Sequence, residues 1–332
     1  MRIPLRQMTD VARYMMRKKR SGEKYFPLVL MLEPLHACNL ACIGCGRIVE
    51  YKDTIRDQMP LEDALGAVDE ADAPIVSICG GEPLIYKHIV PLTNTLIERR
   101  RHVMICTNAL LLERFIKQVP PSTYLSFNVH IDGMRETHDR VVDRDGVFDT
   151  CVRMIKLLKQ NGYRVQTNTT VFRDTTTEEI EELVNLLTSL RVDGMLVTPG
   201  YHYQVLSNDI YLKSDEMPHK FKRVKKLAED HKIINNPIYL EFLTGERDLL
   251  CSPWTTVTRN PRGWKGPCYL ITNGHYKTFK ELHEATDWEY YRTKQDFRCR
   301  DCKLHSGFES TPALDFGKNL KDTFKMVRHY VS

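Results

Sequence analysis

Apolar stretches of two kinds alternate along the first two thirds of the chain. Short runs of consecutive apolar residues, typical of buried strands, are separated by stretches in which apolar residues recur at helical spacing. The predicted strands are 28–32, 75–79, 103–106, 124–131, 164–172 and 195–198. The predicted helices are 4–19, 60–71, 88–100, 110–119, 147–161, 177–191 and 217–231. This alternation predicts parallel βαβ units.

We therefore expect an α/β fold, a partial or full parallel (β/α) barrel, over residues 25–200. Residues 1–24 form a basic amphipathic arm before it, and residues 201–332, where the alternation is lost, form a C-terminal region with four cysteines. No apolar run approaches the roughly 18 residues of a spanning helix. A signal-peptide core is also absent, so the sequence predicts a cytoplasmic protein with reduced cysteines.

Positive charge is concentrated in the arm. The whole chain carries a net charge of +5, and residues 1–24 contain eight basic and two acidic residues. Because the basic character is confined to this segment, the sequence does not indicate nucleic-acid binding. A basic amphipathic helix can bind the inner face of a membrane as a peripheral anchor. The alternative is a solvated helix packed on the barrel.

The first cysteine group has the spacing C-x3-C-x2-C and consists of Cys38, Cys42 and Cys45. Three thiolates can hold three irons of a 4Fe–4S cubane and leave the fourth iron open. S-adenosylmethionine (SAM) can chelate that iron, and one electron from the cluster then cleaves SAM to a 5′-deoxyadenosyl radical. Structural zinc fits this loop poorly, because zinc sites prefer four ligands in paired C-x2-C units.

These cysteines resemble the signature of the radical SAM superfamily, and the resemblance covers roughly residues 25–200. Gly80, Gly81 and Glu82 follow the second predicted strand and resemble the superfamily's GGE motif. The resemblance implies that this turn receives the ammonium group of SAM. An ordinary glycine turn is the alternative, but its position at a strand end disfavours that interpretation.

The same resemblance implies further SAM contacts along the chain. The implied positions are Ile43 beside the adenine, Asn108 of a Thr-Asn pair, His130 and Asp132 of an S-x-D-G-like segment, and Asn168. His130 stands where the superfamily usually has serine, so its role is open, and a structural histidine is the alternative. We expect these motifs on one rim, because ligand sites of parallel barrels lie at the carboxyl ends of the strands.

A second cysteine group lies in the C-terminal region and consists of Cys251, Cys268, Cys299 and Cys302. The spacing C-x11-G-x4-C of its first part resembles the accessory-cluster domains attached to many radical SAM enzymes. Four thiolates can hold a second iron–sulfur cluster or structural zinc. Buried free cysteines without metal are the third interpretation.

Over nearly its whole length, the chain resembles the radical SAM family of adenosylhopane synthases in hopanoid biosynthesis. The resemblance rests on the basic arm, residues 38–46 and 130–133, and C-terminal stretches such as 253–255 and 267–270. It implies addition of the 5′-deoxyadenosyl radical to the alkene of diploptene, a membrane-resident triterpene, with an external reductant such as flavodoxin or ferredoxin. A peptide-modifying or maturase-type radical SAM enzyme is the alternative. A non-catalytic metal-binding protein is disfavoured by the GGE turn.

Addition to an alkene leaves a carbon radical that needs a hydrogen atom, and a thiol is a suitable donor. Outside the two groups the chain has Cys79, Cys106 and Cys151. Cys151 falls within a predicted helix and should pack in the core. Cys106 ends the third predicted strand, on the expected SAM rim. It is therefore the candidate catalytic residue, with a core cysteine as the alternative.

Overall fold

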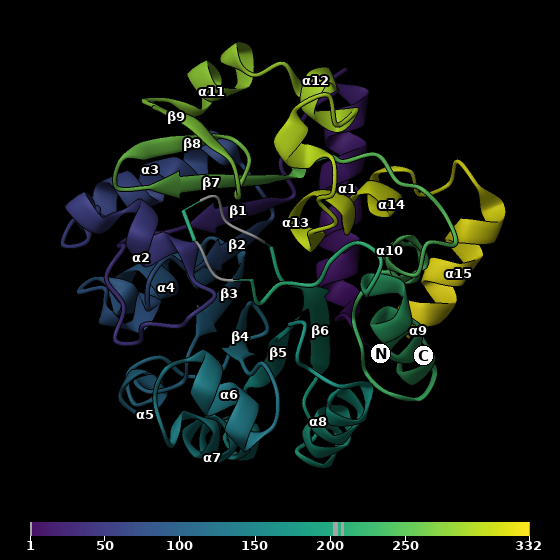
Figure 1. The fold of residues 1–332 in the computed structure, drawn as a ribbon. Helices are drawn as coiled ribbons and strands as arrows, with labels where there is room; N and C mark the ends of the chain where they lie inside the picture. Colours follow the sequence, from purple (N-terminus) through teal and green to yellow (C-terminus); the bar gives the residue numbers. More distant parts are fainter. Residues whose placement is uncertain (1, 202–204, 207–208, 332) are drawn as a thin grey trace.

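The computed structural model describes residues 2–201, 205–206 and 209–331. One nine-stranded sheet runs through it in the order β6-β5-β4-β3-β2-β1-β7-β8-β9. Neighbouring strands are parallel from β6 to β7, and β8 and β9 are antiparallel. Strands β6 and β9 are the two edges, so the fold is an open, partial barrel with helices around its outside (Figure 1).

The strands are β1 Val29–Leu32, β2 Ile75–Ile78, β3 His102–Thr107, β4 Leu125–His130, β5 Arg164–Val171, β6 Gly194–Pro199, β7 Thr256–Asn260, β8 Gly263–Pro267 and β9 Thr272–Tyr276. The longer helices are α1 Leu5–Arg20, α3 Leu61–Ala71, α4 Ile89–Glu98, α7 Val147–Gln160, α8 Thr177–Ser189, α9 Met217–Asp230 and α15 Leu320–Val331. The shorter helices are α2 Gly46–Glu50, α5 Leu112–Ile116, α6 Arg135–Val141, α10 Pro237–Leu243, α11 Phe279–Ala285, α12 Trp288–Arg292, α13 His305–Phe308 and α14 Thr311–Leu314.

The core lies between the sheet and the surrounding helices. Strand residues such as Leu30, Ile105 and Phe127 are fully buried and belong to the same apolar cluster as Leu92 of α4 and Ile155 of α7. In β1 and β3 fully buried side chains alternate with half-buried ones, so one face of these strands packs on the helices and the other is partly open.

The sequence predicts β1–β6 at the right places, but it misses three strands. Strand β7 pairs in parallel with β1, so that Leu30 lies opposite Val257, and the C-terminal region thereby continues the barrel sheet. The missed strands contain polar residues such as Thr258 and Lys265 that are nevertheless buried, and this composition conceals them. The predicted helix 110–119 is shorter in the structure, where α5 spans Leu112–Ile116.

Helix α1 lies at the amino ends of the strands, opposite the rim that carries the cysteines. Asp10 pairs with His102, the first residue of β3, at 3.0 Å, and the Arg6 guanidinium lies over the Tyr124 ring just before β4. The buried Tyr14 packs against Phe26. The amphipathic arm is therefore a helix packed against the amino-terminal end of the barrel.

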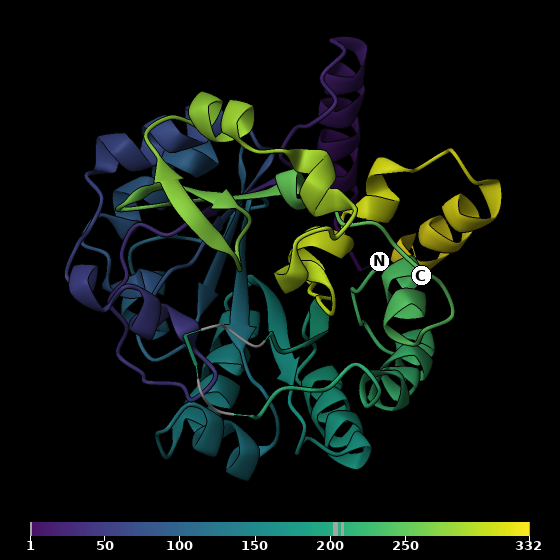
Figure 2. The same ribbon diagram turned by 45° about the horizontal axis from the view of Figure 1, so that its top comes forward.

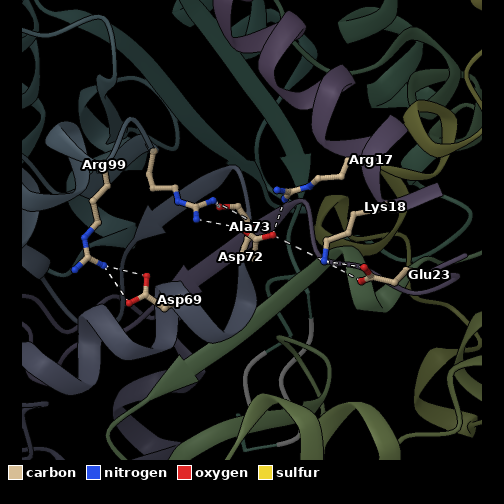
Figure 3. Close-up of polar contacts among 8 residues, drawn as sticks. Arg17, Lys18, Glu23, Asp69, Asp72, Ala73 and Arg99 are labelled. Carbon is tan, nitrogen blue, oxygen red and sulfur yellow. Dashed lines mark hydrogen bonds and ion pairs between the residues drawn. The ribbon is translucent and has the colours of Figure 1, made fainter. Parts of the chain in front are cut away.

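The basic residues of the arm contact acidic and backbone groups of the protein itself. Arg17 pairs with Asp72 at 2.6 Å, and Lys18 lies between Asp72 and Glu23 (Figure 3). Lys19 donates to the Leu314 carbonyl. These contacts favour the interpretation of the arm as a packed helix. In the part of the chain that the structure describes, no helix is long and apolar enough to cross a bilayer.

Candidate active site at the carboxyl rim

The loop between β1 and α2 carries the first cysteine group at the carboxyl end of β1. All three thiols are partly accessible. Burial raises the pKa of Cys38 to about 11, and it raises the pKa of Cys42 as well. The charge of Cys45 contributes to the upward shift of both pKa values. Bound iron would supply the positive charge that three neighbouring thiolates require.

The glycine turn after β2 holds the cysteine loop in place. Gly80 has a φ of +109°, and a Cβ at this position would lie 2.5 Å from the Leu35 carbonyl oxygen. A Cβ on Gly81 would lie only 1.9 Å from the Ala37 oxygen. The two segments are joined by hydrogen bonds from the backbone N–H of Gly81 to Leu35 and of Glu82 to Ala37. Only glycine allows this close approach.

Glu82 connects the glycine turn to the end of β3. Its buried carboxylate accepts hydrogen bonds from the Thr107 hydroxyl at 2.7 Å, the Asn108 backbone N–H at 2.9 Å and the Leu84 backbone N–H at 3.1 Å. Burial raises the pKa of Glu82 to about 7, although these hydrogen bonds oppose the shift. A cationic ligand group would stabilise the charged form.

Asn108 extends the connection to the cysteines. Its side-chain amide donates to the Asn39 side-chain oxygen at 2.7 Å, directly beside Cys38. The cysteine loop, the glycine turn and the Thr-Asn pair are thus one hydrogen-bonded unit.

His130 ends β4 and pairs with Asp132, with 2.7 Å between Nε2 and Oδ2. Burial is the largest single influence and lowers the pKa of His130, but the charge of Asp132 and its hydrogen bond to the ring together outweigh burial, and the net shift is upward. The other Asp132 oxygen accepts from the Thr170 backbone N–H at 2.7 Å. His130 is therefore part of a hydrogen-bonded chain through Asp132 that links β4 to β5.

Two amide oxygens near this pair have no hydrogen-bond partner within the described residues. They are Oδ1 of Asn168, which lies opposite His130 in the register, and Oδ1 of Asn128. A buried acceptor without a donor is costly. Together with the Glu82 carboxylate, these acceptors suit a ligand that carries an ammonium group and hydroxyls, as SAM does.

Ile43 lies at the edge of this arrangement. Its backbone N–H donates to the Val141 carbonyl at 2.9 Å, and its half-buried side chain packs on a small cluster that contains Phe172 and Tyr211. The Tyr211 hydroxyl donates to the Gly44 carbonyl. The predicted contact of Ile43 with adenine stays a prediction.

The three remaining cysteines have different surroundings. Cys106 points to the inner face of the sheet, where its sulfur lies 3.4 Å from the Ser77 hydroxyl and 3.8 Å from the Asn128 amide nitrogen. Burial raises its pKa, so the thiol is protonated at neutral pH. Cys79 is buried, and Cys151 is fully buried against the His138 ring. Cys106 is the partly accessible one of the three.

The C-terminal cysteines meet around one cavity of about 40 Å³, which all four line. This volume exceeds the roughly 10–15 Å³ that one water needs. Burial raises the pKa of Cys302 to about 11, and burial together with the neighbouring thiols raises the pKa of Cys299 to about 12. Within the described residues, no three His, Cys, Asp or Glu side chains are arranged to hold a single ion. A cluster with one thiolate per iron accepts more widely spaced ligands.

A buried polar group between the two cysteine sites was missed by the sequence analysis. Glu33, fully buried at the end of β1, pairs with Arg47, which follows Cys45 by two residues. The Tyr269 ring, next to Cys268, lies 4.3 Å from the Arg47 guanidinium. The sequence signal for this buried pair is Glu33 itself, a charged residue directly after the apolar strand Val29–Leu32.

Two protein families match the chain. Residues 32–187 match the radical SAM superfamily, and residues 195–326 match a domain of unknown function, DUF3463. The GTP 3′,8-cyclase of Clostridium perfringens (strain 13 / Type A) is 25% identical over 255 residues, which are 70% of this chain and 77% of the cyclase. The Fe-coproporphyrin III synthase of Methanosarcina barkeri is 25% identical over 203 residues, which are 58% of this chain and 50% of that protein.

Solved structures share the fold. The crystal structure of Streptococcus suis SuiB superposes with a TM-score of 0.68 at 17% identity, over 94% of this chain and 79% of SuiB. A structure of anSMEcpe with bound AdoMet has a TM-score of 0.61 at 17% identity and covers 92% of each chain.

Proposed function

Because the chain belongs to the radical SAM superfamily and uses a 4Fe–4S cluster and SAM, we propose that it adds the 5′-deoxyadenosyl group to the exocyclic alkene of diploptene, which yields adenosylhopane. In this proposal Cys38, Cys42 and Cys45 hold the cluster. When bound, the cluster and SAM supply the 5′-deoxyadenosyl radical after an external one-electron reductant has acted. The observation that carries the proposal is the protonated thiol of Cys106 on the inner face of the sheet.

The rim residues bind and orient SAM in this scheme. The Glu82 carboxylate, already fixed by three donors, accepts the ammonium group of SAM. Asn168 offers its buried amide oxygen, and the His130–Asp132 pair lies opposite it on the neighbouring strand. Gly80 and Gly81 keep the carboxylate against the cysteine loop.

Cys106 then completes the reaction by giving a hydrogen atom to the tertiary carbon radical that addition leaves. The S–H bond breaks, a C–H bond forms, and a thiyl radical remains on Cys106. One electron and one proton from the external reductant and solvent restore the thiol. This role needs a protonated thiol, because a thiolate has no hydrogen atom to give. Burial favours the protonated form, since it raises the pKa of Cys106.

The cavity that the four C-terminal cysteines line also has aromatic and aliphatic walls. Its lining includes Tyr269, Leu270, Ile271 and Phe308, with Tyr201 from the segment that follows β6. Its volume of about 40 Å³ is far below the roughly 300–1,000 Å³ of a ligand pocket, so this cavity bears on the accessory metal group and not on the substrate. We also propose that Cys251 and its three partners hold a second iron–sulfur cluster rather than zinc.

Anaerobic incubation with SAM, reductant and diploptene, followed by mass spectrometry, tests the proposal. We expect a saturated adenosyl adduct from the wild type. In Cys106→Ala the saturated adduct should fall at least tenfold while unsaturated or off-path adducts rise. Cys151→Ala is the matched control and should retain the product pattern. An unchanged yield of saturated adduct from Cys106→Ala would exclude this donor.

Peptide modification is the second candidate, and the four clustered C-terminal cysteines favour it because accessory-cluster domains are frequent in that group. It predicts uncoupled 5′-deoxyadenosine formation without any diploptene adduct. That outcome would reject the hopanoid substrate and leave the radical SAM chemistry intact.

A further inference from the structure

Helix α15 presents its apolar side to solvent. Leu320, Phe324, Val327 and Val331 recur at the spacing of one helix face, and they are 82%, 70%, 45% and 55% exposed. Figures 1 and 2 show α15 at the edge of the molecule, beside the chain end. We call these four residues the α15 stripe. A contiguous exposed apolar stripe marks an interaction surface.

The inner face of α15 is more polar than the outer one. Asp322 forms two hydrogen bonds with Arg247, at 2.9 and 3.0 Å, and Lys325 pairs with Glu241 of α10. Met326 is the buried apolar residue of the helix. An ordinary surface helix buries its apolar face. The Asp322–Arg247 and Lys325–Glu241 pairs instead hold the polar face of α15 against the protein. The stripe is exposed for this reason.

The helix is also fixed at both ends. The Asn319 side chain accepts hydrogen bonds from the backbone N–H groups of Lys321 and Asp322, at 3.0 and 3.1 Å. At the other end, the backbone N–H of Arg2 donates to the Tyr330 carbonyl at 3.0 Å. The stripe therefore belongs to an anchored helix.

Basic residues line one side of the stripe. Lys321 and Arg328 each follow a stripe residue, Leu320 and Val327, and so lie about 100° further around the helix. Both are exposed, and neither forms an ion pair with another described residue. Acidic Asp322 is turned inward onto Arg247. The outer face thus combines apolar and positive groups.

We propose that the α15 stripe docks the protein on an anionic membrane surface, with the apolar side chains in the interface and Lys321 and Arg328 at the lipid headgroups. Amphipathic helices with basic flanks lie in this way in the plane of the bilayer. A second copy of this chain fits the surface less well in an antiparallel pairing, because two stripes in contact would then place both basic rows on the same side. Docking of this kind is independent of the proposed substrate.

Vesicle co-sedimentation of the full chain tests the proposal without any substrate. We expect binding to vesicles of phosphatidylcholine with phosphatidylglycerol, weaker binding to phosphatidylcholine alone, and weakening by salt. Phe324→Glu combined with Leu320→Glu should reduce the binding constant at least about tenfold, because two apolar side chains then no longer leave water. Leu5→Glu is the matched control, since Leu5 is 60% exposed on α1.

Lys321→Gln combined with Arg328→Gln should reduce binding to the anionic vesicles and leave the weaker binding to phosphatidylcholine unchanged. Circular dichroism checks that the variants fold. Uncoupled SAM cleavage is a second check, because none of these residues belongs to the proposed SAM site. Equal vesicle binding by wild type and the Leu320/Phe324 variant would overturn the proposal. So would a wild-type dimer in sedimentation velocity that the same variant dissociates, because the stripe would then be a self-association surface.

Discussion

Glu82 offers a test of the SAM site through pH. Its pKa is raised to about 7, so the unliganded protein carries a charged Glu82 in about nine of ten molecules at pH 8 and about one of ten at pH 6. If the carboxylate receives the ammonium of SAM, the bound form must be charged. The apparent Kd for SAM should therefore rise about tenfold between pH 8 and pH 6.

Glu82→Gln should remove this dependence. A hydrogen bond to a charged group contributes about 1.5–3 kcal/mol. At pH 8 the Kd of the variant for SAM should therefore be about 10- to 100-fold higher than that of the wild type. Between pH 6 and 8 the Kd of the variant should stay constant. Isothermal titration of the reconstituted protein under anaerobic conditions measures both. A variant that shows the same tenfold change as the wild type would refute the assignment.

The same shift affects stability with a defined sign. The unfolded carboxyl titrates near 4.5 and the folded one near 7, so the folded state holds the extra proton between these values. The Glu82 contribution to the free energy of unfolding should therefore decrease as pH rises from about 4.5 to about 7, because the folded state must give up the proton that it binds more tightly. Urea unfolding of the wild type and Glu82→Gln across this range measures the difference.

Three further changes test the rim and the accessory site. Replacement of Cys38, Cys42 or Cys45 by Ala should abolish 5′-deoxyadenosine formation, measured by chromatography, and wild-type rates in any one variant would contradict its role as a ligand. In the triple variant, iron analysis after reconstitution should find about four irons at the C-terminal cysteines, whereas one zinc would indicate a structural site. Gly81→Ala should cost about 1–3 kcal/mol of stability in urea unfolding, because its Cβ would overlap the Ala37 oxygen, whereas Gly66→Ala, which meets no atom within 4 Å, should not destabilise the protein.

The sequence contains most of the information about the barrel. The buried strands of the parallel sheet contain short apolar runs, such as Val29–Leu32 and Val103–Ile105, that stand out from the helices between them. The rim motifs follow strand ends at fixed places, and the structure brings the Glu82 turn, Asn108 and the cysteine loop into one hydrogen-bonded unit. Local pattern and topology agree at this rim, and for that reason sequence reasoning finds it.

The C-terminal half escapes the same reasoning because long-range partners determine it. Lys265 is buried in β8, where Glu50 of α2 neutralises it at 3.1 Å, and no local pattern reveals that pairing. Helix α15 is the clearer case. The predicted helices end at residue 231 and do not include this one, and the usual rule for an amphipathic helix would turn Leu320 and Phe324 inward. Arg247 and Glu241, about 80 residues earlier, bind its polar face instead and thereby decide which side of the helix meets solvent.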